Sequence, residues 1–338
     1  MITFADPAAF LEATIALPQP SAAATAAARA RQAELTKPAG SLGRLEEIAA
    51  FMAGWQGTAR PRIECVRAVV FAGNHGVAAR GVSAFPVEVT AQMVANFQAG
   101  GAAINVLARA AGADLAVVPL DLDRPTLDIA QAPAMSEAEC LAALNAGATA
   151  VANDTQLLFV GEMGIGNTTP AAALCAAAYG GDAADWCGRG TGIDGGALAR
   201  KVAAVDQALR LHQSACDTPF ETLRRLGGRE IVAMAGAILA ARLLRVPVLL
   251  DGFIACAAIV PLAAVQPGFV DHCIAAHCSA ETAHEQLLAK LDLKPLLRLD
   301  MRLGEGTGAA LAVPLVRAAL TAHNEMATFA EAAVARCQ

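Results

Sequence analysis

The chain has 338 residues, 56% of them hydrophobic and 17% charged, and its formal net charge at pH 7 is −6. This composition excludes a disordered chain, and the lack of any run of Lys or Arg argues against a nucleic-acid partner. Charged residues and prolines interrupt the apolar stretches before they reach the length of a membrane span, so we expect no contact with a membrane.

The N-terminal residues and the cysteines indicate the compartment. The first 20 residues carry no basic region, and Asp6 and Glu12 interrupt what would be the apolar part of a signal peptide. The nine cysteines are scattered singly, without the spacing of a disulfide scaffold. Both observations predict a cytoplasmic protein.

The order of apolar patterns predicts the fold class. Residues 7–35 are rich in Ala, Gln, Glu and Arg, which predicts one or two helices. Short apolar runs then alternate with alanine-rich helical stretches, and this order predicts an α/β fold, a Rossmann-like parallel sheet with helices on both faces. The predicted strands are 67–72, 115–120, 157–160 and 246–250.

The length of the chain predicts one large and one small domain. From residue 308 onward the sequence returns to an Ala- and Leu-rich helical pattern. We expect this tail to pack on the N-terminal helices. The prediction is a large α/β domain at 60–307 that carries the active site, and a small helical domain formed from 1–59 and 308–338.

Each predicted strand is followed by Gly or Asp, in the segments AGNHG, PLDLD, GEMGIGN and DGF. In open α/β sheets, ligands bind beyond the carboxyl ends of the strands. The strand ends are therefore the expected position of a binding site.

The segment GEMGIGNTTPAAAL at 161–174 follows a predicted strand. Its glycines allow a tight turn, Thr168 and Thr169 can cap a helix, and Pro170 suits the first helical position. This is the architecture of an anion site at a helix N-terminus, although an ordinary turn explains the pattern equally well. No GK[ST] follows, which disfavours ATP hydrolysis.

The segment RLGEGTGAAL at 302–311 is a second glycine turn that opens into a helix. Glu305 lies between two glycines, where a ligand can approach the backbone and where the positive end of the helix favours a carboxylate. An acid at the surface would not need both glycines, because each costs conformational entropy, but a solvated acid at a helix N-terminus stays the alternative interpretation.

The segment GRGTGIDGGALARK at 188–201 has the spacing of a dinucleotide-binding loop, but no apolar strand precedes it. We interpret it as a mobile loop over the site. Lys201, on the helix that follows, can neutralise an anionic substrate, and a solvated lysine is an equally good interpretation.

Two apolar residues after the first strand are candidates for an aromatic-binding slot. Phe85 lies beside a proline, and Met93 lies one turn into the next helix. They can hold a flat ring, but positions in the core explain them as well. The segment HCIAAHC at 272–278 is a weak metal candidate, because i, i+5 spacing does not place like ligands on one helical face.

The motifs together resemble the nicotinate-nucleotide:dimethylbenzimidazole phosphoribosyltransferase family of cobalamin nucleotide-loop assembly. The resemblance covers about residues 37–319. The matching blocks are KPAGSLGRLE (37–46), HGVAARGVSAFPVEVTAQMVANFQAGGAAINVLAR (75–109), GEMGIGNTTPAA (161–172), GRGTGIDGGALARK (188–201), VPVLLDGFIACAA (246–258), HCSAE (277–281) and MRLGEGTGAALAVPLVRAA (301–319).

The resemblance implies a homodimer, and the chemistry of the reaction it implies requires neither a metal nor an organic cofactor. It implies Glu305 as the catalytic base and places Ser279 near the phosphate of the donor. It implies that the glycine loops at 161 and 304 hold the phosphoribosyl group. The implied substrate-binding residues are Glu162, Met163, Gly164, Gly166, Asn167, Thr168, Lys201, Ser279, Leu303, Gly304, Phe85 and Met93.

One position departs from the family, which usually has Asp-His after the first strand where this chain has Asn74 and His75. The departure removes a carboxylate near the strand end. The residues of the slot do not decide which base the enzyme accepts.

Two other functions compete with this interpretation. An NAD-dependent oxidoreductase would need G-x-G-x-x-G directly after a first strand, and the sequence lacks that arrangement. A non-catalytic nucleotide- or base-binding protein could use the same glycine loops. Only an assay separates it from an enzyme, because a binding protein needs no catalytic base.

Overall fold

A computed structural model describes residues 1–188, 190, 192 and 194–335 of the chain. The strands are β1 (Val66–Ala72), β2 (Ala113–Pro119), β3 (Leu157–Met163), β4 (Val248–Leu250), β5 (Cys273–Ala275), β6 (His277–Cys278) and β7 (Leu297–Arg298). The α-helices are α1 (Pro7–Ile15), α2 (Ala22–Glu34), α3 (Arg44–Gln56), α4 (Glu88–Ala99), α5 (Ala103–Ala110), α6 (Glu137–Thr149), α7 (Thr168–Tyr179), α8 (Ala183–Trp186), α9 (Gly195–His212), α10 (Pro219–Leu226), α11 (Arg229–Leu243), α12 (Phe253–Ala258), α13 (Val260–Val265), α14 (Thr282–Lys290) and α15 (Thr307–Glu325). Short 3-10 helices are η1 (Gly76–Arg80), η2 (Gln213–Ala215) and η3 (Phe269–His272).

The centre of the molecule is a five-stranded parallel sheet with the order β2-β1-β3-β4-β5. The predicted α/β fold is therefore confirmed, and each of the four predicted strands coincides with one in the sheet. The fifth strand was missed. Helical spacing was the wrong assumption for the HCIAAHC segment, which forms β5 and β6, three and two residues long.

Side chains of β1 alternate between two separate cores. Val69 and Phe71 belong to one buried cluster, while Ala68 and Val70 belong to the other. A parallel strand buried on both faces needs apolar residues at consecutive positions, which explains the unbroken apolar run VVFA.

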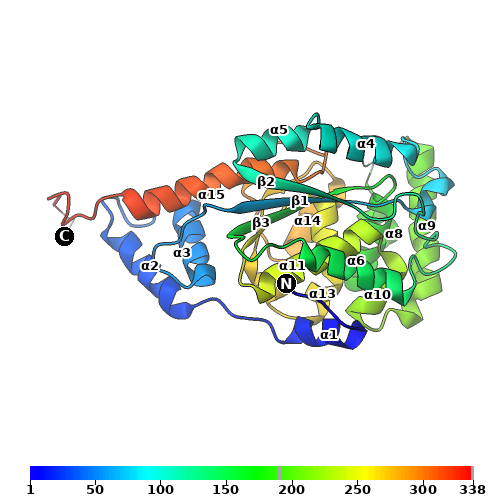
Figure 1. The fold of residues 1–338 in the computed structure, drawn as a ribbon, viewed down its shortest axis with the longest axis horizontal. Helices are drawn as coiled ribbons and strands as arrows, with labels where there is room; N and C mark the ends of the chain where they lie inside the picture. Colours follow the sequence, from blue (N-terminus) through cyan, green and yellow to red (C-terminus); the bar gives the residue numbers. More distant parts are fainter. Residues whose placement is uncertain (189, 191, 193, 336–338) are drawn as a thin grey trace.

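The two cores lie under different layers of helices. Helices α4, α5 and α15 lie on one side of the sheet, and α6 and α11 lie on the other (Figure 1). The helices on both faces agree with the predicted doubly covered sheet.

Segments from both ends of the chain lie side by side, at the left of Figure 1. Arg31 on α2 donates from Nε to the carbonyl of His323 on α15 at 2.8 Å, and Gln32 bonds the His323 ring at 2.8 Å. In contrast, α1 lies beside α10, where the rings of Phe10 and Phe220 have centroids 6.2 Å apart. The predicted domain boundaries stay a prediction.

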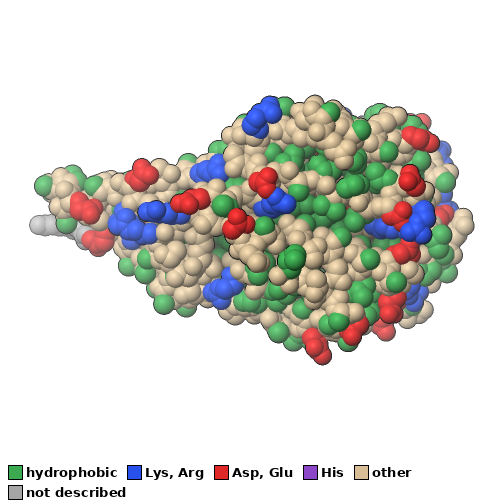
Figure 2. Space-filling view, viewed as in Figure 1, with side chains coloured by type: hydrophobic (Ala, Val, Ile, Leu, Met, Phe, Trp, Pro, Cys, Tyr) green, Lys and Arg blue, Asp and Glu red, His purple; other side chains and the backbone are tan. Residues whose placement is uncertain are grey.

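The face drawn in Figure 2 has acidic and basic side chains interspersed, and apolar side chains gather between α4 and α6, beside the edge strand β2. None of the helices in the described part of the chain has the length and apolar character that a membrane span requires.

Candidate active site

A cavity lies at the carboxyl ends of the strands, as the sequence predicted. Its walls come from the segments that follow β3, β4 and β6, together with the loop before α15. The structure brings most of the predicted substrate-binding residues into this cavity. They are Glu162, Met163, Gly164, Gly166, Asn167, Thr168, Lys201, Ser279, Leu303 and Gly304.

Three predicted residues do not line the cavity. Phe85 is 50% exposed, in the loop that also contributes Ser83 to the wall. Met93 is partly buried and packs against the core on the α4 side of the sheet. Glu305 is only 4% exposed and lies directly behind the wall residue Gly304.

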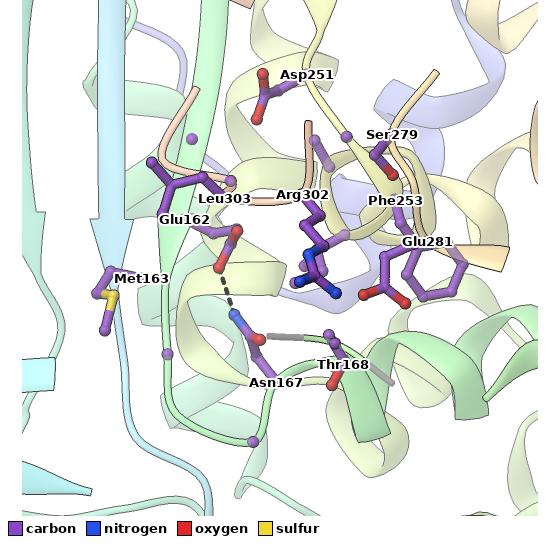
Figure 3. A pocket seen from close by; sticks show the side chains of 18 of the residues that line it. Glu162, Met163, Asn167, Thr168, Asp251, Phe253, Ser279, Glu281, Arg302 and Leu303 are labelled. Carbon is purple, nitrogen blue, oxygen red and sulfur yellow. Dashed lines mark hydrogen bonds between the residues drawn. The ribbon is translucent and has the colours of Figure 1, made fainter. Parts of the chain in front are cut away.

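The loop between β3 and α7 forms one wall. Gly166 has φ +89°, a conformation that favours glycine, and α7 begins at Thr168. The prediction that Pro170 is the first helical residue was therefore wrong by two positions. Asn167 stands at the N-cap and donates from its side-chain amide to the Glu162 carboxylate, as the dashed line in Figure 3 shows.

A buried pair of side chains, His75 and Glu230, packs against the loop between β3 and α7 at Gly164. The Nε2 atom of His75 lies 2.6 Å from Oε1 of Glu230, and both side chains are inaccessible to solvent at 1% and 0%. A Cβ on Gly164 would lie 2.7 Å from that Glu230 oxygen, so this position requires glycine. The neighbouring Asn74 donates from Nδ2 to the carbonyl of Leu122 at 3.0 Å. This hydrogen bond uses a donor that an ionised Asp lacks.

The loop before α15 holds Glu305 in a rare backbone conformation, with φ +62°. Asp251, directly after β4, fixes the loop by accepting from two backbone amides at the start of the helix. The N–H of Gly306 lies 3.2 Å from Oδ2, and that of Ala309 lies 2.8 Å from Oδ1. The carboxylate of Asp251 therefore caps α15.

Buried carboxyl groups dominate the electrostatics of this region. Burial raises the pKa of Glu305, although a backbone hydrogen bond from Ile104 opposes the shift, and the Asp251 carboxylate adds to it. Burial also raises the pKa of Asp251 to about 7, against its backbone hydrogen bonds. Burial likewise raises the pKa of Glu162 well above its ordinary value. The Oε2 atom of Glu305 has no hydrogen-bond partner within the described residues.

Two basic side chains line the cavity. Lys201 is 1% exposed, and its Nζ donates to the carbonyl of Gly188 at 2.9 Å; burial lowers its pKa. Arg302 is exposed, and Figure 3 shows its guanidinium pointing toward the carboxylate of Glu281. Of the predicted mobile loop at 188–201, residues 189, 191 and 193 lie outside the described residues. In the described part of the chain, no group of three His, Cys, Asp or Glu side chains is placed to hold a metal.

Several residues of the cavity wall were not among those predicted from the sequence. Asp251, Phe253, Glu281 and Arg302 all line the cavity. A signal was present for each, because the first two belong to the DGF segment after a strand and the others belong to the HCSAE and RLGEG blocks.

A cavity at the strand ends, a glycine turn that opens α7 and buried carboxylates beside it fit a phosphoribosyltransferase. A family model described as phosphoribosyltransferase matches residues 17–334. The chain is 66% identical over 335 residues to the nicotinate-nucleotide–dimethylbenzimidazole phosphoribosyltransferase of Novosphingobium aromaticivorans, with 99% of each chain covered. It is 58% identical over 332 residues to the enzyme of the same name from Cereibacter sphaeroides, with 98% of each covered.

A solved structure agrees with these relatives. The crystal structure of CobT from Thermus thermophilus superposes with a TM-score of 0.87 at 44% identity, covering 93% of this chain and 100% of that one. The chain therefore belongs to the nicotinate-nucleotide–dimethylbenzimidazole phosphoribosyltransferase family.

Proposed function

We propose that the protein transfers the phosphoribosyl group of nicotinate mononucleotide to 5,6-dimethylbenzimidazole or a related base. The products are α-ribazole 5′-phosphate and nicotinate. Family membership supports the reaction, and the observation that carries it in this chain is the glycine-walled cavity with the buried Glu305 behind its wall.

The reaction is a direct displacement at C1′ of the ribose. One ring nitrogen of the benzimidazole attacks C1′ while the bond from C1′ to the pyridinium nitrogen breaks, so the β-linked donor gives an α-linked product. The pyridine ring takes the bonding electron pair and leaves neutral, which means that it needs no acid. The benzimidazole loses the proton of its other nitrogen, and a carboxylate base must accept it.

Glu305 is the proposed base. Its raised pKa makes the carboxylate a stronger base. Its Oε2 atom, which has no hydrogen-bond partner within the described residues, can accept the proton. Because Glu305 does not itself line the cavity, the proposal requires a small rearrangement of the wall at Gly304 when substrate binds. No metal or organic cofactor enters this mechanism.

The other residues have proposed binding roles. Backbone N–H groups at the start of α7 and the Lys201 ammonium attract the anionic phosphate. Met163 and Leu303 supply apolar contacts for the aromatic base, and Leu303 is 51% exposed. Phe85 and Met93 stay proposed members of the same slot and would have to approach it on binding.

The direct test is incubation of purified protein with nicotinate mononucleotide and 5,6-dimethylbenzimidazole, without added metal or NAD. Chromatography follows the release of nicotinate and the formation of the α-ribotide in equal amounts. Donor binding without product, across a panel of benzimidazoles, purines and phenols, would refute the transfer reaction and leave a binding protein.

We also propose a homodimer in the cytoplasm with the two-domain division given above. The resemblance to the family supports the dimer, and the exposed apolar side chains beside β2 are consistent with an interface. Light scattering should give a molar mass twice that of the 34.4 kDa chain. A mass of one chain at micromolar concentration would contradict the dimer.

A further inference from the structure

The hydrogen bonding of Ser279 shows which kind of substrate group it can bind. This side chain lines the cavity and is 9% exposed. Its Oγ lies 3.0 Å from Nδ1 of His284, which is fully buried on α14. Within the described residues, Oγ has no other hydrogen-bond partner.

The backbone determines the protonation of His284. The N–H of Ser279 donates to Nδ1 of His284 at 2.9 Å, and a backbone amide can only donate. The Nδ1 atom must therefore be unprotonated, which places the proton of the neutral ring on Nε2. That atom lies 3.5 Å from Sγ of Cys256, a weak acceptor buried on α12.

Charge on the ring is disfavoured as well. Burial lowers the pKa of His284 to about 3, and the neighbouring His277 adds to the shift. The ring is therefore neutral at pH 8, where the test below is run, and Nδ1 stays an acceptor.

The consequence concerns the hydroxyl of Ser279. At 3.0 Å from an unprotonated nitrogen, the attractive arrangement directs the Oγ–H toward Nδ1, which it shares with the backbone N–H. The lone pairs of Oγ are then left for the cavity. Ser279 presents a hydrogen-bond acceptor to the substrate, not a donor.

A pyridine mononucleotide offers few partners for an acceptor. Its carboxylate and its phosphate dianion only accept hydrogen bonds, and its pyridinium nitrogen has no proton. The hydroxyls of the ribose are the donors.

We propose that His284 is a positioning residue that makes Ser279 an acceptor for a ribose hydroxyl of the mononucleotide. The inference rests on the proposed function. The proposal moves Ser279 away from the phosphate, where the resemblance had placed it, because the Ser279 Oγ and the phosphate oxygens are both acceptors and repel each other. The phosphate stays assigned to the N-terminus of α7 and to Lys201.

The test compares nicotinate mononucleotide with its 2′-deoxy and 3′-deoxy analogues at pH 8, where the phosphate is a dianion. We expect the wild type to lose about tenfold in kcat/KM on one of the two analogues, the usual effect of one neutral hydrogen bond. Ser279→Ala should lose a similar factor on the ribonucleotide and nothing on that analogue. Its discrimination between the two donors would disappear.

Variants of His284 separate positioning from a structural role. Asn can place its side-chain oxygen where Nδ1 lies, so His284→Asn should retain the discrimination, whereas His284→Leu should lose it. His212→Asn is the matched control, because His212 is also buried, at 2% exposure, but bonds the carbonyl of Ile129 outside the cavity wall. It should leave the discrimination unchanged.

Equal losses for Ser279→Ala on all three donors would overturn the proposal. If the same variant also bound inorganic phosphate more weakly, the side chain would be a phosphate ligand. Calorimetric binding of the three mononucleotides needs no turnover and therefore separates this proposal from the proposed function. Discrimination in binding without product would refute transfer alone, and product without discrimination would refute the role of Ser279 alone.

Discussion

Gly161 on β3 lies against the backbone of Glu305 so closely that a Cβ at Gly161 would stand 2.2 Å from the Glu305 carbonyl carbon. This contact joins the central sheet to the loop that holds the proposed base. The conformation of the loop thus depends on the absence of one side chain.

Gly161→Ala should displace the Glu305 loop, because the clash involves backbone atoms that no rotamer change can relieve. Overpacking of this kind costs about 1–3 kcal/mol of stability. A shift of about 1 Å at a catalytic group costs about 10²-fold in rate. We expect losses of this size in urea unfolding and in kcat. Gly54→Ala is the control, since a Cβ there meets the side chains of Thr25 and Pro20 and Gly54 does not line the cavity, and equal kcat values for the two variants would contradict the dependence.

Glu305→Gln should reduce turnover by about 10²- to 10⁴-fold, because the amide cannot accept a proton. Binding of nicotinate mononucleotide, measured by calorimetry, should change little. A folded variant with normal turnover would remove Glu305 from the role of base. Glu162→Gln should be measured in parallel, because Glu162 lines the cavity and also has a raised pKa.

The same substitution should change stability in a pH-dependent way. The folded protein holds the Glu305 proton to a higher pH than the unfolded chain, whose carboxyl titrates near 4.5. The stabilisation from this group is therefore complete below 4.5 and is lost as the pH rises through the raised pKa. Glu305→Gln should unfold at a higher temperature than the wild type at pH 7, and the difference should shrink at pH 4. If the two proteins differ in unfolding temperature by the same amount at pH 7 and pH 4, burial of the ionised Glu305 carboxylate does not destabilise the fold.

The strands β1 to β3 could be predicted because each contains a run of four or more apolar residues, AVVFA, LAVV and LLFV, as strands of a parallel sheet do. Strand β5 could not, because three residues carry no periodicity, and its neighbours His272 and His277 suggested a metal site instead. The glycine motifs located the cavity. They did not predict Asp251 as the cap of α15, because its partners Gly306 and Ala309 lie more than 50 residues away and meet it only through the sheet topology.

Asp251→Asn tests whether this cap holds the catalytic loop. Asn retains one acceptor but directs its NH₂ group at a backbone N–H, so we expect a loss of about 1 kcal/mol in stability and a lower kcat. Ser136→Ala is the matched control, because Ser136 caps α6 through the N–H of Glu139 and does not line the cavity. It should lose similar stability and keep its kcat. If both variants keep kcat, the cap has no influence on the site.

Asn74→Asp restores the residue usual in the family and should destabilise this chain. Asn74 is 5% exposed, and its Nδ2 donates to the carbonyl of Leu122. An ionised Asp would place an unpaired charge against that carbonyl oxygen, at a cost of about 2–4 kcal/mol. Burial raises the pKa of such a carboxyl, and its protonated form can donate to Leu122 again. Urea unfolding should therefore show a large loss at pH 8 and a smaller one at pH 5, while Asn153→Asp at an exposed position should show neither. Wild-type stability of Asn74→Asp at pH 8 would mean that the hydrogen bond to Leu122 contributes nothing and that the site accepts a carboxylate.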